Sequence, residues 1–336
     1  MANKNLTAAK RAKNDEFYTR LTDVEKELIH YRPHFKDKTV FLNCDDPTYS
    51  AFWRHFHKLF AVYGLKKLIA THYEYDENVH SYAMVYEGGS DNDVSTGIRI
   101  ELEGNGDFRS DGCIEFLKES DIVVTNPPFS LFREYVAQLV EYGKKFLIIG
   151  NMNAITYKEI FPLLKDGVMW LGNKSLGSEM YFHVSSEYQN WLRENKTEGS
   201  AYKIVNNELM GRMAAACWFT NLDIKKRHEE LFLSSTYYKK DGFVPQASLD
   251  RWPHYDNYDA IEVSKVKDIP VDYAGVMGVP ITFLDKYNPE QFEIIKFRKG
   301  DDDKDLSVNG KCPYFRILIR ARHPHPAGVP VVINHE

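Results

Sequence analysis

The first half of the chain alternates strand-like runs with helix-like patterns, and this alternation restricts the fold more than any other feature. Strand-like runs occupy residues 38–42, 67–71, 121–125 and 145–149, and helical patterns occupy 50–60, 113–118 and 131–142. Strands that alternate with helices form parallel sheets covered by helices on both faces. The sequence therefore predicts a doubly wound α/β sheet, in which ligands bind at the carboxyl ends of the strands.

After about residue 165 the pattern changes. Strand-like runs continue at 168–171, 180–184 and 215–220, and from residue 236 on the chain is rich in Tyr, Asp, Pro and Gly. Within this last part, residues 288–295 are typical of a short helix, with Asn288 as N-cap and Pro289 at the first helical position. We expect a separate α+β region over 236–336, whose Pro-containing end from His323 onward is loosely ordered.

Composition excludes several classes of protein. The chain has 336 residues, 43% of them hydrophobic, and no apolar run is long enough to cross a membrane. Its cysteines, at 44, 113, 217 and 312, are too far apart for a zinc motif. We therefore expect a globular cytoplasmic protein with reduced thiols, no metal site and no membrane partner.

The segment that carries chemistry is Asn126-Pro127-Pro128-Phe129, between a predicted strand and a predicted helix. The two prolines hold the backbone extended, so that the Asn126 side-chain oxygen and the Pro127 carbonyl are outward acceptors. Two acceptors that take the protons of a planar amine localise its lone pair, and Phe129 offers a flat face on which a ring can stack. This pattern is typical of a catalytic site that methylates an exocyclic amine such as adenine N6.

The sequence resembles a known family over about residues 10–320. Asn-Pro-Pro-Phe after an apolar strand resembles the catalytic motif of S-adenosylmethionine-dependent amino-methyltransferases. The segments that narrow this resemblance to EcoRI-type adenine DNA methyltransferases are 14–19 (NDEFYT), 43–47 (NCDDP), 104–109 (GNGDFR), 126–132 (NPPFSLF) and 275–283 (GVMGVPITF).

This resemblance implies a Rossmann-like class I methyltransferase sheet, mostly parallel with an antiparallel hairpin, and it assigns roles to three parts of the chain. These are a basic N-terminal arm with a cofactor motif (1–25), a catalytic domain (26–235) and a C-terminal target-recognition region (236–336). The implied activity is adenine-specific DNA methylation at N6 of a base extruded from the duplex. It would serve a type II restriction–modification system or act as an orphan enzyme.

The resemblance also implies site residues. The implied cofactor-binding residues are Phe17, Tyr18, Thr19, Asn43, Cys44, Asp45, Pro47, Asp107, Phe108 and Asn126. The loop at 43–47 has no glycine, unlike the Gly-rich turn of the broader superfamily, and offers acidic acceptors for the methionine ammonium instead. The acid that binds the ribose hydroxyls is left open, because His72 and Glu74 both follow the second strand.

The target base and the duplex need further contacts. Phe129 and either Trp218 or Phe219 are candidates to stack on the extruded base, since alternation along a strand sends neighbouring side chains to opposite faces. The net charge is −5, so we expect DNA contacts from local basic stretches, with Lys10, Arg11, Lys13, Lys225, Lys226 and Arg227 as candidates.

Two other classes of function remain as alternatives. RNA-base and protein-glutamine methyltransferases also use Asn-Pro-Pro-aromatic, although the glutamine enzymes usually carry a Gly-rich first loop. A DNA-binding module without catalysis is the other alternative, against which the intact segment 126–129 argues. We expect a monomer that acts on double-stranded DNA. In a restriction–modification system, though not as an orphan enzyme, it would share its site with a cognate restriction endonuclease without necessarily binding it.

Overall fold

The computed structural model describes residues 18–74, 80–89, 93–213 and 215–326, which belong to two compact units. The first unit comprises the chain up to Ile160 together with Met169–Ile224, and the second comprises Phe161–Val168 and the chain from Lys225 onward. The longer part of the second unit begins at Lys225, and Lys226 forms an ion pair within that unit with Asp285 (Nζ to Oδ1, 2.7 Å).

The elements of the first unit follow one another in the order that the alternation predicts, with a small additional sheet. They are β1 (Tyr18–Thr19), α2 (Leu21–Leu28), η1 (Ile29–Phe35), β2 (Thr39–Leu42), α3 (Ala51–Lys58), α4 (Phe60–Tyr63), β3 (Lys67–Thr71), β4 (Tyr82–Tyr86), β5 (Ile98–Glu101), α5 (Asp111–Glu119), β6 (Ile122–Thr125), η2 (Phe129–Leu131), α6 (Phe132–Glu141), β7 (Lys145–Asn151), η3 (Met152–Thr156), β8 (Trp170–Leu171), β9 (Met180–His183), α8 (Ser186–Asn195), β10 (Tyr202–Val205), β11 (Glu208–Met213) and β12 (Ala216–Thr220).

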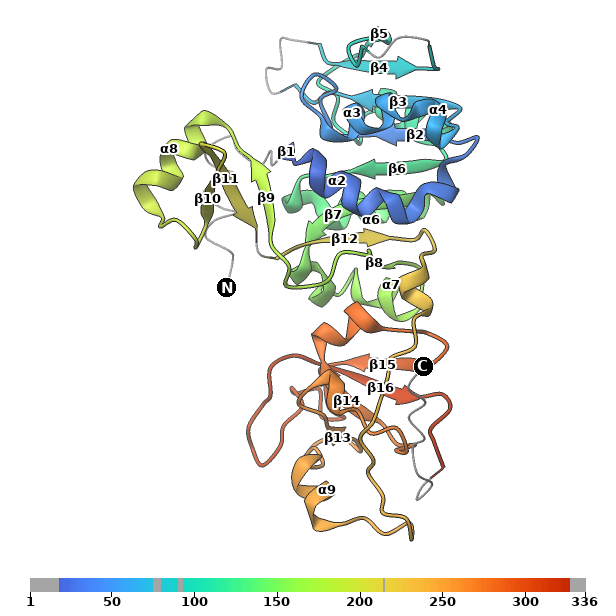
Figure 1. Cartoon of the computed structure of the whole chain (residues 1–336), viewed down its shortest axis with the longest axis vertical. Coiled ribbons are helices and arrows are strands. Elements are labelled where there is room, and N and C mark those ends of the chain that lie inside the picture. The colour runs from blue at the N-terminus through green and yellow to red at the C-terminus, as the bar shows by residue number, and fades with distance from the viewer. Residues whose placement is uncertain (1–17, 75–79, 90–92, 214, 327–336) are drawn as a thin grey trace. The chain divides into compact units, whose positions relative to one another are not determined.

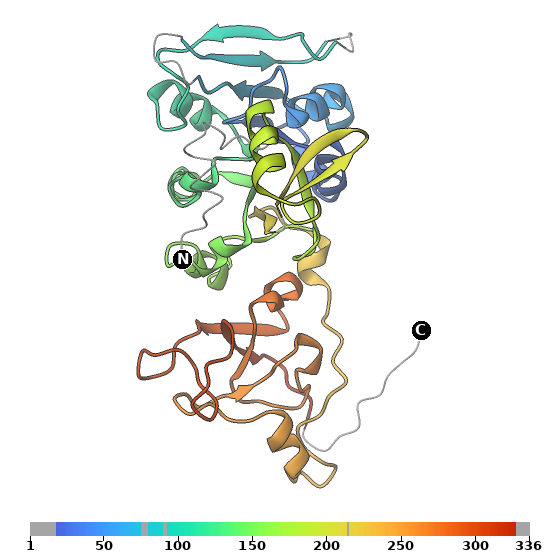
Figure 2. The same cartoon turned by 90° about the vertical axis from the view of Figure 1, so that its left-hand side faces the viewer.

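The central sheet is large and mostly parallel in direction. Its strands, within the described residues, lie in the order β5-β4-β3-β2-β6-β7-β12-β8. The pairs β3–β2, β2–β6 and β6–β7 are parallel, whereas β4 and β12 run antiparallel to their neighbours. Figure 2 shows α3 and α4 on one side of this sheet and α5 and α6 on the other. The predicted α/β sheet with helices on both faces is confirmed.

The strands of this sheet are buried because helices cover both faces. Each residue of β2 and β6 is buried, which agrees with the continuous apolar runs of strands inside a parallel sheet. On one face α3 contributes Phe52, Trp53 and Phe56 to the core. This helix begins where the sequence predicts, because the Ser50 side chain accepts a hydrogen bond from the Trp53 N–H (2.8 Å) as an N-cap.

A buried histidine on α3 makes the stability of this unit sensitive to acid. His55 is 4% exposed, its Nε2 atom lies 2.9 Å from the Tyr63 hydroxyl, and burial lowers its pKa from 6.5 to about 4. Between these two pH values the unfolded chain binds a proton that the folded chain does not. The His55 contribution is therefore fully present above pH 6.5 and is lost as the pH falls toward 4, at a cost of about 3 kcal/mol.

We expect His55→Gln to flatten this dependence, since glutamine can hydrogen-bond Tyr63 but does not titrate. The measurement is the free energy of unfolding by urea at pH 7.5 and at pH 4.5 for both proteins. The exposed His30 offers a matched control, because His30→Gln should leave the drop between the two pH values unchanged. Equal drops in wild type and His55→Gln would contradict the prediction.

A smaller sheet lies beside the carboxyl ends of the parallel strands. It has the order β1-β9-β11-β10, and α8 packs on it through a cluster that contains Tyr188, Leu192 and Leu209. In Figure 1 the arrowheads of β2 and β6 point toward this sheet. Sequence analysis found β9 but not β10, β11 or α8. The small sheet therefore lies opposite the edge of the central sheet at which proteins of this fold class bind ligands.

The second unit contains a mixed sheet of its own. Its elements are α7 (Phe161–Lys165), η4 (Lys225–His228), α9 (Gln246–Arg251), β13 (Ile261–Glu262), η5 (Val266–Asp268), β14 (Met277–Pro280), η6 (Ile281–Lys286), β15 (Phe292–Phe297) and β16 (Arg316–Ala321). The strand order of this sheet is β13-β14-β16-β15. Within it the described pair β13–β14 is parallel, and the pairs β14–β16 and β16–β15 are antiparallel.

The predicted helix at 288–295 is wrong, because the second half of that segment belongs to strand β15. Asn288 does form one turn: its Oδ1 atom accepts the Glu290 N–H (2.8 Å) and its carbonyl accepts the Phe292 N–H (3.0 Å). The chain then extends, since Phe292 and Ile294 are buried at a spacing of two residues and β15 pairs with the apolar strand β16. Tertiary pairing therefore overrides the local capping signal.

The C-terminal end is fixed where it is described. Arg322 Nε donates to the Pro289 carbonyl (2.7 Å) and the His325 N–H donates to the Val271 carbonyl (2.8 Å). The rest of the tail that the sequence analysis expected to be loosely ordered, residues 327–336, lies outside the described residues. No helix in the described part of the chain is both long and apolar enough to pass through a bilayer.

Candidate active site

The Asn-Pro-Pro-Phe segment stands directly at the carboxyl end of β6. Strand β6 ends at Thr125, and the 3₁₀ turn η2 begins at Phe129 and is closed by a hydrogen bond from the Leu131 N–H to the Pro128 carbonyl (3.0 Å). Asn126 and Phe129 are half-buried, and Phe129 packs against the main core cluster. The segment therefore lies where the sequence predicts, at the ligand-binding edge of the sheet.

The loop after β2 makes a sharp turn without a glycine. Cys44 adopts φ of +59°, a left-handed backbone conformation that glycine adopts more readily than other residues. The Asn43 side chain stabilises this turn, because its Oδ1 atom accepts the Cys44 N–H (2.9 Å) and the Thr71 hydroxyl (2.8 Å). Burial raises the pKa of the Cys44 thiol well above its ordinary value, so the thiol stays protonated.

Asn43 is fully buried, and this changes the role that the sequence analysis expected for it. Its exposed fraction is 0%, its side-chain oxygen is used twice within the protein, and its carbonyl accepts a hydrogen bond from the Thr125 hydroxyl. Thr125 immediately precedes Asn126. Asn43 therefore connects the loop after β2 to the catalytic segment.

Acidic side chains of the same loop meet the end of β3. Asp46 Oδ1 accepts the Tyr82 hydroxyl (3.1 Å), and its Oδ2 lies 3.3 Å from His72 Nδ1. The other ring nitrogen of His72 is 3.5 Å from Glu74 Oε2. Asp45 accepts a hydrogen bond from the Ser50 hydroxyl. Two carboxylates of the first loop and one of the second therefore lie along a single edge.

The loop that contains Asp107 is joined to this edge by the backbone. Glu74 N–H donates to the Asn105 carbonyl (2.8 Å). Gly106 has φ of +75°, and a Cβ atom there would lie 2.1 Å from the His72 carbonyl oxygen, so the close approach needs glycine. The structure thus brings together all the loops that the sequence analysis assigned to cofactor and catalysis.

Asp107 has a partner that the sequence analysis missed. Arg109 donates to both Asp107 oxygens (Nε to Oδ1, 2.9 Å; NH2 to Oδ2, 2.7 Å) and also pairs with Glu134 on α6 (3.0 Å). These hydrogen bonds from Arg109 lower the pKa of Asp107. Phe108 is 3% exposed and packs edge-on against Tyr135 at 5.0 Å between ring centroids. Neighbouring side chains therefore hold both predicted adenine-binding residues, Asp107 by Arg109 and Phe108 by Tyr135.

Neither candidate on β12 presents a ring to the site. Trp218 is 1% exposed and meets Phe52 edge-on at 6.0 Å, whereas Phe219 is 0% exposed and lies 5.0 Å from Phe132 on the other face of the sheet. Alternation along the strand is as expected, but helices cover both faces. Of the three predicted stacking residues, Phe129 alone is half-buried at the carboxyl edge.

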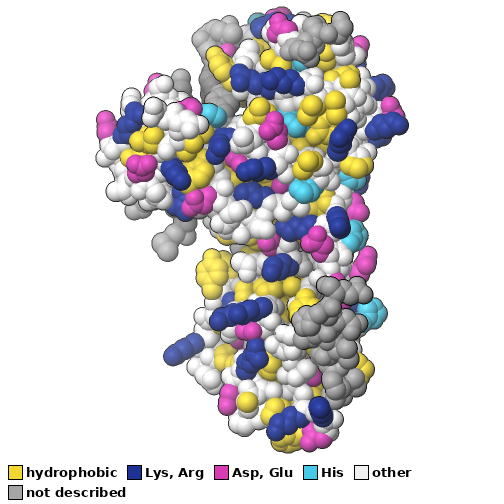
Figure 3. Space-filling model, viewed as in Figure 1, with side chains coloured by type: hydrophobic (Ala, Val, Ile, Leu, Met, Phe, Trp, Pro, Cys, Tyr) yellow, Lys and Arg dark blue, Asp and Glu magenta, His cyan; other side chains and the backbone are white. Residues whose placement is uncertain are grey.

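The basic candidates differ in availability. Lys226 is paired with Asp285, and both side chains are mostly buried (17% and 12% exposed), so its charge is already neutralised. Lys225 is exposed and Arg227 is half-buried. Lys10, Arg11, Lys13 and the cofactor candidate Phe17 lie outside the described residues. Figure 3 shows Lys and Arg side chains interspersed with Asp and Glu on the face that it draws, without one dominant basic patch.

The fold and the catalytic segment define the class of the protein as an α/β methyltransferase. The sequence matches the family described as "Adenine-specific methyltransferase EcoRI" over residues 5–322. It is 50% identical over 333 residues to the type II methyltransferase M.EcoRI of Escherichia coli, a match that covers 95% of this chain and 96% of that protein.

Two Mycoplasma proteins are also similar. The type II methyltransferase M.MgeORF184P of Mycoplasma genitalium is 38% identical over 93% of this chain and 97% of its own length. M.MpnI of Mycoplasma pneumoniae is 38% identical over 94% of this chain and 97% of its own length. No solved structure matches the chain. The chain belongs to the EcoRI family of adenine-specific methyltransferases.

Proposed function

We propose that the protein methylates N6 of a specific adenine in duplex DNA, as the modification enzyme of a type II restriction–modification system. The observation that supports this most is Asn126-Pro127-Pro128-Phe129 at the carboxyl edge of a methyltransferase sheet, in a chain of this family. The Asn126 side-chain oxygen and the Pro127 carbonyl accept hydrogen bonds from the two N–H groups of the adenine amine. Phe129 stacks on the base once it has left the duplex.

The polar edge of the sheet fits S-adenosylmethionine by its chemistry. When bound, this cofactor supplies an electrophilic methyl group. Asp45 and Asp46 offer carboxylates to the methionine ammonium of the cofactor. Glu74 is the acid best placed for the ribose hydroxyls, because its backbone N–H is hydrogen-bonded to the loop that contains Asp107. Asp107 and Phe108 face the adenine of the cofactor. Among the described residues, no group of three or more His, Cys, Asp or Glu side chains could hold a metal ion. The proposed chemistry uses no metal.

The second unit supports a role in target recognition through one exposed aromatic cluster. Tyr314 is 73% exposed and stacks on Phe315, with ring centroids 4.9 Å apart. The guanidinium of Arg298 lies 4.4 Å from the Phe315 ring centroid. Arg298 is also paired with Asp305 (2.8 Å), so its charge is already neutralised. The feature that suits contacts with nucleic acid is therefore the stacked pair of rings, of which Tyr314 is exposed. We therefore assign DNA contacts to Tyr314 and Phe315 as well as to the basic N-terminal arm.

The experiment that tests the proposed function maps modified bases in DNA from cells that express the chain. We expect N6-methyladenine at one short sequence, fully methylated, and no modified base in cells that express Asn126→Ala. Methylated RNA or glutamine in place of methylated DNA would contradict the proposal. Resistance of the DNA to an endonuclease that cuts the same sequence would connect the activity to restriction–modification.

Asp107→Ala should weaken binding of S-adenosylmethionine about two- to tenfold, because one hydrogen bond in a partly buried site is worth about 0.5–1.5 kcal/mol. Calorimetry measures this affinity directly. Arg109→Ala is the matched control, since it breaks the same ion pair but keeps the carboxylate. Equal cofactor affinities in the two variants would remove Asp107 from the cofactor site.

A further inference from the structure

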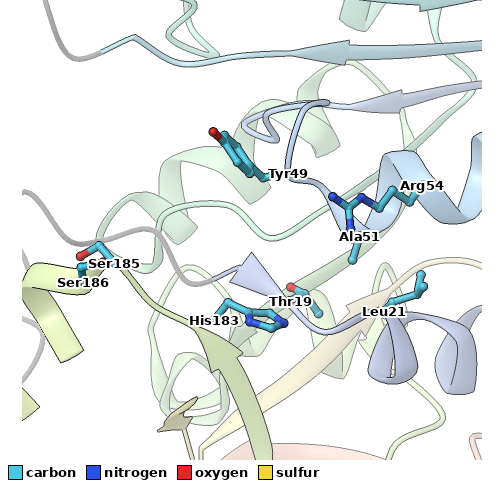
Figure 4. A pocket seen from close by; sticks show the side chains of 8 residues that line it. All are labelled: Thr19, Leu21, Tyr49, Ala51, Arg54, His183, Ser185 and Ser186. Atoms are coloured by element: carbon cyan, nitrogen blue, oxygen red, sulfur yellow. The ribbon is translucent and has the colours of Figure 1, made fainter. Parts of the chain in front are cut away.

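A groove separates the start of α3 from the start of α8 and has no role so far. It has a volume of about 630 Å³ and is lined by Thr19, Leu21, Tyr49, Ala51, Arg54, His183, Ser185 and Ser186. Figure 4 shows these side chains around one opening, with those from α3 opposite those from β9 and α8. Apart from Thr19, no lining residue belongs to the loops assigned above to cofactor or catalysis. We call it the α3–α8 groove.

The charge of the α3–α8 groove favours an anion. Arg54 is exposed on α3, and within the described residues no carboxylate lies within ion-pair distance of its guanidinium. Helix α8 begins at Ser186 with Ser185 as its N-cap, so the positive end of the helix lies at the opposite wall. None of the lining residues is acidic, although Glu208 pairs with His183 (2.8 Å) and Glu187 lies in the first turn of α8.

A second observation indicates a ligand. Thr19 is only 5% exposed, and its hydroxyl oxygen has no hydrogen-bond partner within the described part of the chain, although it lines the groove. Buried polar atoms without a partner are rare in folded proteins and often mark the place of a missing ligand. A hydroxyl can donate to an anion. The same groove therefore offers a cation, a helix N-terminus and an unused donor.

We propose that the α3–α8 groove binds a backbone phosphate of the DNA substrate. Arginine matches the planar, bidentate geometry of phosphate oxygens, and Thr19 donates from the base of the groove. Tyr49, 68% exposed at the rim, provides a face for the adjoining sugar or base. This assignment rests on the proposed action on DNA. It places a phosphate contact on the first unit, beside the carboxyl edge where the target adenine must enter.

The test compares two charge deletions on the same helix. Arg54→Gln removes a charge from the groove, whereas Lys58→Gln removes one from the exposed last turn of α3, outside the groove. Duplex binding is measured at several salt concentrations. Arg54→Gln should weaken binding roughly three- to tenfold and make the slope of log K against log salt shallower by about 0.9, the value for one phosphate. Lys58→Gln should leave the slope unchanged.

A second variant, Ser186→Asp, should change the charge of the groove without destabilising the fold. An acidic residue in the first turn stabilises a helix, but here it places negative charge in the groove. We expect duplex binding to fall at least as much as in Arg54→Gln, with the melting temperature unchanged or raised. Cofactor affinity is measured in both variants as well, because Thr19 in the same groove belongs to the segment that the family resemblance assigns to the cofactor. If the groove binds DNA, neither Arg54→Gln nor Ser186→Asp should change that affinity.

Three results would overturn the assignment. They are an Arg54→Gln slope equal to that of wild type, equal slopes in Arg54→Gln and Lys58→Gln, or a loss of cofactor affinity in Arg54→Gln. The last would assign the groove to the carboxylate of the cofactor. Failure of the proposed function is distinct: the wild type would then methylate no duplex, while the salt titration would still decide whether a phosphate binds here.

Discussion

Asn126→Ala should lower the single-turnover rate of methyl transfer by about 10²–10³-fold, the effect of losing one preorganised group that acts on the reacting atoms (about 2.7–4 kcal/mol). The side chain is held for this role: Asn126 is half-buried directly after a fully buried strand, and Pro127 and Pro128 restrict the backbone that follows it. Cofactor affinity, measured by calorimetry, should change less than about threefold, because the loops after β2 and β3 remain intact.

A conservative variant separates this role from a general disturbance of the loop. Asn126→Asp keeps an acceptor oxygen at the same place, so it should retain more activity than Asn126→Ala. Melting temperatures of both variants should stay close to that of wild type, since the side chain lies outside the main core cluster. An Asn126→Ala enzyme with a single-turnover rate within threefold of wild type would contradict the assignment.

The parts of the fold that sequence predicts are those with strong local signals. Continuous apolar runs indicated β2, β3, β6 and β7, because strands buried on both faces carry mostly apolar side chains. The helix-like pattern over residues 50–60 indicated α3. Strands β10 and β5 gave no such signal, since their side chains are largely exposed and only pairing with β11 and β4 defines them.

The residues of the candidate site also divide into those with a local sequence signal and those without one. Asn126 and the acidic loop were found because rare residue combinations follow predicted strands. Arg109 was missed as the partner of Asp107, although an arginine two residues after an aspartate in a turn was a usable signal. The burial of Trp218 and Phe219 was not predictable, because alternation says which face a side chain takes but not whether a helix covers that face. The α3–α8 groove depends on how β9 and α8 pack: the strand-like run predicted β9 but not its position in space, and no local pattern predicted α8.

Asn43→Ala should have the second large effect, on stability and on the rate of reaction together. The substitution removes the oxygen that accepts the Cys44 N–H and the Thr71 hydroxyl, at a position that is 0% exposed. Leaving these buried donors without a partner costs about 2–4 kcal/mol of unfolding free energy. The left-handed turn at Cys44 also loses its support, so cofactor binding should weaken.

The effect on catalysis follows from the link to β6. The Asn43 carbonyl accepts the hydroxyl of Thr125, the residue before Asn126, so a shift of the loop moves the catalytic side chain. A displacement of about 1 Å can cost about 10²-fold in rate. We therefore expect kcat to fall far more than the KM for DNA. A residue that only supported the fold would lower the melting temperature without changing kcat at a temperature where the protein is folded.

Thr125 provides the matched pair that isolates this link. Thr125→Val keeps the shape of the side chain but removes the hydroxyl that reaches the Asn43 carbonyl, whereas Thr125→Ser keeps the hydroxyl and removes a methyl group. If Asn43 positions the catalytic segment, Thr125→Val should lower kcat and Thr125→Ser should restore most of it, although serine packs less well at a position that is 0% exposed. Equal kcat values for the two variants would show that Asn43 acts on stability alone.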